Sequence, residues 1–193
     1  MTLVELVLAV GMFSFLMASV GHLVLMSLRV QQSWGGAVAS AQRAEHALNR
    51  LAQDLHAARP LFGVPFQVVS GGDGVEFARL GPEGWLRVVY RLEPDGEMRR
   101  LIRDEWTWTT GQVSPDPLQH ELLARLAAGR FAAGMLMEDG QLVWTSSWDG
   151  EADGIPRLVQ LEAVLPSTAS GKAITVSRVI RNPAGTLPED EQP

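Results

Sequence analysis

The chain has no cysteine, and this absence removes three kinds of chemistry at once. Without a thiol there is no disulfide, no thiolate ligand for a metal ion and no cysteine nucleophile. An excess of basic residues is also lacking, since the 193 residues carry a formal net charge of −6 at pH 7. A nucleic-acid-binding surface needs clustered positive charge to neutralise phosphates, so we do not expect nucleic acid as a partner.

A third absence lies near the N-terminus, where Leu6 to Leu28 contains no Asp, Glu, Lys or Arg. At about 1.5 Å per residue, a helix of that length reaches roughly 35 Å, enough to cross a hydrocarbon core of about 30 Å. A soluble helix of this length needs a polar face, and this segment has none. The pattern predicts one membrane-anchor helix, which we place at residues 1–29.

The anchor also lacks the basic charge of an ordinary export signal. A cleavable secretory signal opens with a basic region, whereas this chain begins Met1-Thr2-Leu3-Val4-Glu5, with an acid and no base. An ordinary signal anchor carries flanking positive charge that holds its N-terminus inside, and here Arg29 only follows the segment. We expect that the missing charge belonged to a short basic leader that has been removed.

The stretch from Met1 to Glu5, running straight into an apolar helix, resembles the mature N-terminus of type IV pilins and pseudopilins. In that family a prepilin peptidase cuts before the first residue, usually Phe and here Met1, and the new amino group is methylated. The resemblance implies that Glu5 pairs with the positive amino terminus of a neighbouring subunit during assembly. From the residues alone, Glu5 can equally serve only to stabilise the first helical turn.

From residue 30 to residue 60 the helical pattern continues but becomes amphipathic, and Pro60 is expected to end it. Apolar residues recur at spacings of three and four between Ala37 and Ala58, which places them on one stripe. Polar residues, Asp54 among them, occupy the other faces. The sequence predicts a helical spine that joins the anchor to a globular head, and a coiled coil is the alternative.

The first part of this spine is rich in small residues, which let another helix approach closely. We expect it to contact partner helices, whereas Leu48, Leu51 and Leu55 face the head. Two adjacent glycines mark the place where the helix would bend if it bends at all. The residues predicted to pack on partner helices are Gly35, Gly36, Ala37, Ala41 and Ala44.

Beyond the spine, short β-rich segments alternate with glycine and proline turns, which predicts an antiparallel β-rich head over residues 61–182. Residues 117–128 are predicted as helix or irregular structure, and the acidic, proline-rich tail at 183–193 as disordered. The fold class is therefore α+β, a long helix packed on sheet elements. The strand pairs are expected to turn at residues 71–74, 94–96, 139–140 and 166–172.

Three stretches carry a closer resemblance to the J-type minor pseudopilin of type II secretion systems. They are LNRLAQDL at 48–55, the run from VEF through RVVYRL to MRR at 75–100, and DGQLVWTSSW followed by IPRLVQL at 139–161. The resemblance implies a structural subunit and not an enzyme, without a cofactor, that joins I-type and K-type minor pseudopilins at the pseudopilus tip and supports protein export. It implies a single-pass anchor in the bacterial inner membrane and a head in the periplasm.

No catalytic motif stands out, and one acidic turn is the only metal candidate in the sequence. Asp149, Glu151 and Asp153 are spaced like the start of a calcium loop, although an EF-hand needs Glu where Gln160 stands. A solvated acidic turn is the other interpretation. Two other functions stay open: a minor pilin of a type IV pilus or competence system, and a membrane-anchored exported enzyme or binding domain.

Processing gives a first testable prediction. If prepilin peptidase generates the terminus at Met1, intact-mass analysis of protein purified from its native membrane should find a methyl group on the terminal amine. A formyl or acetyl group on Met1, or a basic extension still attached, would contradict this expectation.

Overall fold

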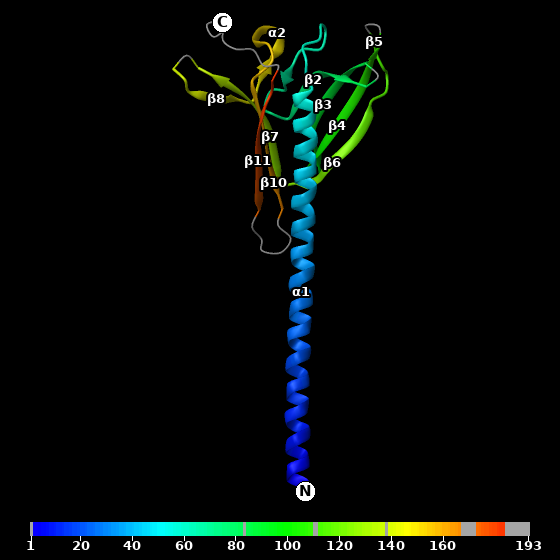
Figure 1. Ribbon diagram of the computed structural model, residues 1–193, viewed down its shortest axis with the longest axis vertical. Helices are drawn as coiled ribbons and strands as arrows, with labels where there is room; N and C mark the ends of the chain where they lie inside the picture. The colour runs from blue at the N-terminus through cyan, green and yellow to red at the C-terminus, as the bar shows by residue number, and fades with distance from the viewer. Residues whose placement is uncertain (1, 83, 110–111, 138, 167–172, 184–193) are drawn as a thin grey trace.

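The computed structural model describes residues 2–82, 84–109, 112–137, 139–166 and 173–183, and the side chains of residues 31–37, 109, 112–113 and 136 lie outside this description. One long helix leads into a β-rich head at its C-terminal end (Figure 1). The predicted α+β fold class is confirmed. The predicted tail lies outside the described residues from residue 184 onward.

Helix α1 runs without interruption from Leu3 to His56, so the anchor and the spine form one element. Its 54 residues correspond to a length of about 80 Å at about 1.5 Å per residue. The backbone stays helical through Gly35 and Gly36, and Figure 1 shows no kink at this level. Because the two parts form one helix, fixing the rotation of the spine about the helix axis also fixes the rotation of the anchor.

The helix ends shortly before Pro60, as the sequence predicts. Ala57 is the C-cap residue, and its amide donates to the carbonyl oxygen of Gln53 at 3.1 Å. The Arg59 guanidinium then donates to the carbonyl oxygens of His56, at 3.1 Å, and Ala58, at 2.7 Å. These bonds satisfy carbonyls that have no partner at a helix C-terminus, and the proline prevents the helix from continuing.

The first sheet covers one side of the spine. Its strands run in the order β5-β4-β3-β2-β1-β9, and β6 pairs with the same edge of β4 as β5 does. All of its pairings are antiparallel, and the predicted strand pairs around residues 71–74 and 94–96 are confirmed. The strands are β1 (Gln67–Val68), β2 (Gly74–Gly81), β3 (Gly84–Asp95), β4 (Met98–Thr109), β5 (Gln112–Val113), β6 (Leu118–Leu126) and β9 (Trp148–Asp149).

The second sheet lies on the other side of the spine in Figure 1. Its strands run in the order β11-β10-β7-β8, and the two predicted pairs, β7 with β8 and β10 with β11, are confirmed. The chain then returns to the first sheet, because Trp148 belongs to β9, which pairs with β1. The remaining elements are β7 (Ala128–Leu136), β8 (Leu142–Thr145), the short helix α2 (Gly150–Asp153), β10 (Leu158–Leu165) and β11 (Ile174–Arg181).

The interpretation of residues 117–128 as helix or irregular structure is wrong, because strand β6 occupies most of this segment. Its pairing with β4 has two register shifts, and at the one between Leu123 and Leu126 strand β6 carries one residue more than β4, as in a β-bulge. The extra residue brings Leu126 back to the side of the strand that carries Leu123, and both leucines are buried. Leucines three residues apart on one face imitate the spacing of a helix, which explains the error.

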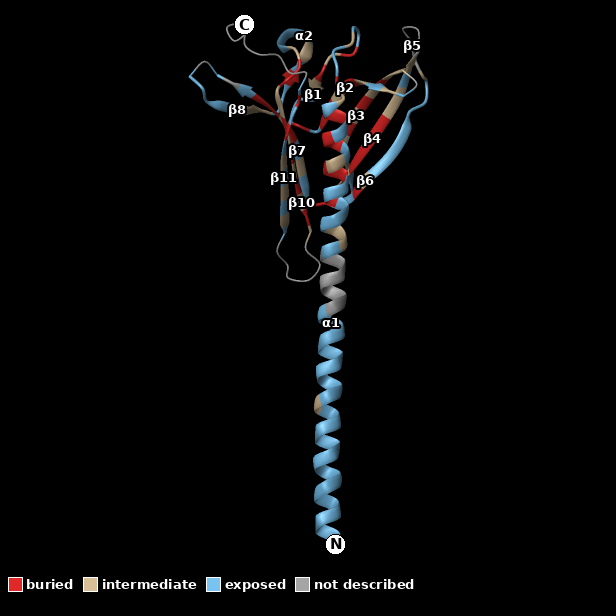
Figure 2. Ribbon diagram, in the orientation of Figure 1, coloured by how far each residue is buried: buried red, intermediate tan, exposed pale blue. Residues whose placement is uncertain are grey.

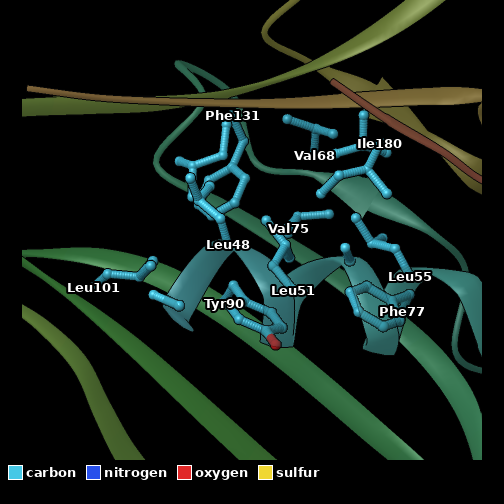
Figure 3. Close-up of a cluster of buried hydrophobic side chains, with 14 of the residues drawn as sticks. Leu48, Leu51, Leu55, Val68, Val75, Phe77, Tyr90, Leu101, Phe131 and Ile180 are labelled. Atoms are coloured by element: carbon cyan, nitrogen blue, oxygen red, sulfur yellow. The ribbon is translucent and has the colours of Figure 1, made fainter. Parts of the chain in front are cut away.

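A single core lies between the two sheets and the last turns of α1. Figure 2 shows that burial on the helix begins only where the head surrounds it. In Figure 3, Leu48, Leu51 and Leu55 project from α1 among side chains of both sheets, which include Phe131 of β7 and Val75 of β2. The buried apolar stripe consists of Ala44, Ala47, Leu48, Leu51, Ala52 and Leu55 of the helix, and it continues in Ala58 just beyond the helix end.

The turn between β1 and β2 joins the two sheets. The amide of Phe131 in β7 donates to the carbonyl oxygen of Gly72 at 2.7 Å, and Arg99 of β4 donates to the Asp73 carboxylate at 2.7 Å. Gly72 has a φ of +77°, and a Cβ at this position would lie 2.5 Å from the carbonyl oxygen of Phe131. Glycine is therefore required here both by the backbone conformation and by the close approach of β7.

Leu51 gives a prediction for stability. Its side chain is fully buried in the core, so Leu51→Ala should lower the free energy of unfolding of the head by about 2–5 kcal/mol. The measurement is chemical unfolding of the full chain in detergent micelles, followed by near-ultraviolet circular dichroism. Gln53→Ala, on the exposed side of the same helical turn, is the matched control and should change it by less than about 0.5 kcal/mol. Equal curves for the two variants would contradict the assigned core.

Candidate membrane anchor and assembly site

The first half of α1 is long and apolar enough to cross a membrane. The span is Leu3–Val30, and within the described part of the chain the head covers none of it. Two of its three serine hydroxyls find partners inside the helix, since Ser14 donates to the carbonyl oxygen of Val10 and Ser19 to that of Phe15, both at 2.8 Å. Polar groups satisfied in this way are compatible with a hydrocarbon surrounding.

Glu5 lies in the first turn of this span. The backbone amide of Thr2 donates to the Oε2 atom of Glu5 at 3.4 Å, and the side chain is exposed. A carboxylate in the first turn also interacts favourably with the positive end of the helix dipole. Part of its hydrogen-bonding capacity remains open to a group from outside the chain, since a carboxylate accepts about four bonds. Met1, predicted as the processing site, lies outside the described residues.

The predicted partner-packing stripe divides into three parts in the structure. The side chains of Gly35, Gly36 and Ala37 lie outside the described residues. Ala41 is exposed and remains available to a partner.

Ala44 is 1 % exposed and belongs to the head's own core, so its assignment to a partner contact is wrong. Strands β6 and β11 both lie against α1, and a small side chain allows them to approach. The part of the spine that is buried in the head therefore begins at Ala44, and not at Leu48 as the sequence suggested.

A buried ion cluster fixes the spine to the first sheet. The Oδ2 atom of Asp54 accepts hydrogen bonds from the Tyr90 hydroxyl and from Nε of Arg103, each at 2.7 Å. Arg103 also pairs with Glu105, whose Oε2 atom accepts a bond from Arg79 at 3.1 Å. Asp54 and Arg103 are each 2 % exposed. The cluster therefore links one residue of the helix to three strands of the sheet.

The cluster changes the proton affinities of its members. Burial raises the pKa of the Tyr90 hydroxyl well above its ordinary value, and the neighbouring Asp54 carboxylate raises it further. Burial alone would lower the pKa of the Arg103 guanidinium, but its bonds to Asp54 and Glu105 raise it overall. Burial opposes ionisation of Glu105, yet its bonds to Arg103 and Arg79 hold its pKa below the ordinary value. Near neutral pH, Tyr90 thus stays neutral, Arg103 stays positively charged and Glu105 stays ionised, as their bonds in the cluster require.

This cluster escaped sequence reasoning, which placed Asp54 on a polar face of the spine. The partners are far away in the chain, since Arg103 follows Asp54 by 49 residues. The signal that could have revealed it is the alternation in β3 and β4, where Arg103 pairs with the inward-facing Tyr90. An arginine at an inward position of a strand needs a carboxylate partner.

The acidic turn proposed as a calcium candidate has a structural role. The Oδ1 atom of Asp149 accepts a bond from the amide of Glu151 at 3.0 Å and caps α2, while Glu151 and Asp153 are exposed. Among the residues that the structure describes, no three His, Asp or Glu side chains come together as a metal ion would require. The three carboxylates are therefore not arranged as a calcium site.

Comparison with known proteins does not place the chain in a family. No protein-family model matches it, and no curated protein matches it significantly.

Tyr90 allows a direct test of the ion cluster, because it is the only tyrosine in the chain. Its absorbance near 295 nm should show no ionisation near pH 10 while the protein is folded, and ionisation near pH 10 in urea. A pKa raised in the folded state favours folding below about pH 10, and this contribution is lost as the pH rises further. Above pH 10 the free energy of unfolding should fall by up to about 1.4 kcal/mol per pH unit.

The matched variants are Tyr90→Phe, which should remove both the absorbance change and its share of the alkaline loss of stability, and Asp54→Asn, which should let the tyrosine ionise at a lower pH. Ionisation of the folded wild-type chain near pH 10 would show that the cluster does not form.

Proposed function

We propose that this chain is a structural minor pseudopilin, most like the J-type subunit of type II secretion systems, and that it acts without catalysis or a cofactor. It would stand in the bacterial inner membrane with its head in the periplasm, join I-type and K-type minor pseudopilins at the pseudopilus tip, and support protein export. A prepilin peptidase would process its N-terminus. The observation that carries the proposal is the single helix that is at once an apolar span and the core of an antiparallel head.

The uninterrupted helix supports an assembly role in mechanical terms. A linker would let a soluble domain move freely relative to its anchor. Here the anchor continues into the core, and the Asp54–Arg103 pair blocks rotation of the helix against the first sheet. A subunit of this kind transmits the position of its anchor helix to its head. That property suits a filament in which neighbouring helices pack side by side.

The Glu5 carboxylate supports the same proposal. An acid carried to the bilayer centre costs about 2.5–3.5 kcal/mol, and less near the interface, unless a counter-charge compensates it. The amide of Thr2 is its only partner among the described residues, and that bond is long. In an assembly, the amino terminus of a neighbouring subunit would provide the positive charge.

Glu5→Ala tests the proposal. The ammonium group of the neighbouring subunit would lose its counter-charge. If the pair offsets half of the cost of placing the Glu5 carboxylate in the membrane, the affinity of the chain for that subunit should fall by about tenfold. Co-purification with the other minor pseudopilins and export of secreted proteins should both decrease. The thermal melt of the head should not change, because Glu5 lies in the anchor and makes no contact with the head.

Glu45→Ala is the matched control, since it removes an exposed acid from the spine of the same helix. It should leave co-purification and export unchanged. If Glu5→Ala assembles and supports export as well as the wild type, the assembly role is refuted.

A further inference from the structure

A hollow of about 330 Å³ opens where α1 enters the head. Ser40 and Arg43 of the helix form one wall, residues 123–125 of β6 form another, and Leu165 and Pro166 complete it. We call it the basic hollow, because its two charged lining residues are Arg43 and Arg125 and its lining contains no carboxylate.

The two arginines of the hollow lack partners, unlike most of the head's arginines. On the outer face of the first sheet, Arg87 pairs with Glu76 at 2.7 Å, and Arg100 pairs with Glu93 at 2.9 Å. Among the described side chains, neither arginine of the basic hollow has an ion pair or a hydrogen bond. Two uncompensated positive charges on one cavity repel each other, so the hollow favours an anionic occupant.

Arg125 is held in a conformation that the fold does not require of an arginine. It lies in the β-bulge of β6, and it is the only described non-glycine residue with a positive φ, at +60°. Glycine adopts this conformation without strain and is usual at such a bulge. The bulge serves the core by burying Leu123 and Leu126 together, and a glycine at position 125 would serve it equally. Backbone strain retained at an exposed, charged residue is typical of a binding site.

The position of the hollow argues against a lipid as its occupant. Arg43 follows the end of the apolar span, Val30, by 13 residues, which corresponds to about 20 Å along the helix. The polar layer of a bilayer extends only about 5–8 Å beyond the hydrocarbon on each side. The volume and the apolar part of the lining also exceed what a small inorganic anion would fill.

We propose that the basic hollow is a docking site for an acidic segment of a partner protein. Carboxylates of that segment pair with Arg43 and Arg125, and an adjacent apolar side chain packs against Ala124 and Pro166. Charge complementarity also limits the choice of partner, because like charges at the hollow would repel. The site is separate from Glu5 at the other end of the helix, so either site can exist without the other.

Binding of a defined peptide tests the proposal on the full chain in detergent micelles. The probe is a fluorescent peptide that alternates glutamate with leucine, and its counterpart carries glutamine in place of glutamate. Fluorescence anisotropy should show binding of the glutamate peptide, weakened by salt, and much weaker binding of the glutamine peptide. Arg43→Gln and Arg125→Gly should each reduce affinity by about three- to fivefold, and the double variant by about tenfold or more.

Arg181→Gln, which removes one exposed charge at the end of β11, is the control and should change the affinity by less than about twofold. Arg125→Gly should melt at the same temperature as the wild type or higher, because glycine relieves the strained backbone. If Arg125→Gly melts at a lower temperature than the wild type, Arg125 contributes to stability and its role in binding is refuted. Arg43→Gln, on an exposed position of the helix, then still tests the hollow.

Equal binding of the two peptides, or wild-type affinity in the double variant, would overturn the proposal. So would displacement of the peptide by millimolar inorganic phosphate, which indicates a small-anion site. Arginine-dependent binding to vesicles that contain phosphatidylglycerol would instead assign the hollow to lipid.

Discussion

The position of the head on its anchor depends on one buried charge, the carboxylate of Asp54. A carboxylate that is 2 % exposed needs partners, and in this fold Tyr90 and Arg103 supply them from neighbouring strands. Hydrophobic burial is non-directional, so the apolar stripe alone tolerates small rotations of the helix about its axis. Only one rotation brings Asp54 to both partners, and in that rotation Leu51, three residues earlier, and Leu55, the next residue, enter the core. The ion cluster therefore selects one arrangement from those that hydrophobic burial alone would permit.

Because α1 is continuous, this selection extends into its apolar N-terminal span. Each residue of a helix is rotated by about 100° from the one before it, so fixing the direction of Asp54 fixes the directions of Arg43, Ala41 and the whole apolar span. A break at Gly35 and Gly36 would have separated the two halves, but the helix passes through both glycines. A contact made with the apolar span would therefore also set the orientation of the head. Because the helix is continuous, packing in the head's core also stabilises the helical conformation of the spine.

The elements were predictable from the sequence where local signals decide them. An uncharged apolar run predicted the helix of the apolar span, and glycine-containing turns predicted the hairpins. Three features depended on distant parts of the chain and were missed. Asp54 resembled a solvated residue because its partner is 49 residues away. The bulge in β6 gave Leu123 and Leu126 a helical spacing. Ala44 fitted both a partner helix and the head's own strands, and only the closeness of β6 and β11 decides between them.

The correction at Ala44 also changes where a partner can approach. With Ala44 inside the core, the open surface of the spine ends near Ala41, next to Arg43 at the basic hollow. A helix that packs on Ala41 would then reach the mouth of the hollow. Close helix packing gains mainly from van der Waals contacts and discriminates little between apolar partners. Arg43 and Arg125, which have no partner among the described side chains, add the discrimination. They favour a partner with an acidic residue near the hollow and repel one with a basic residue there.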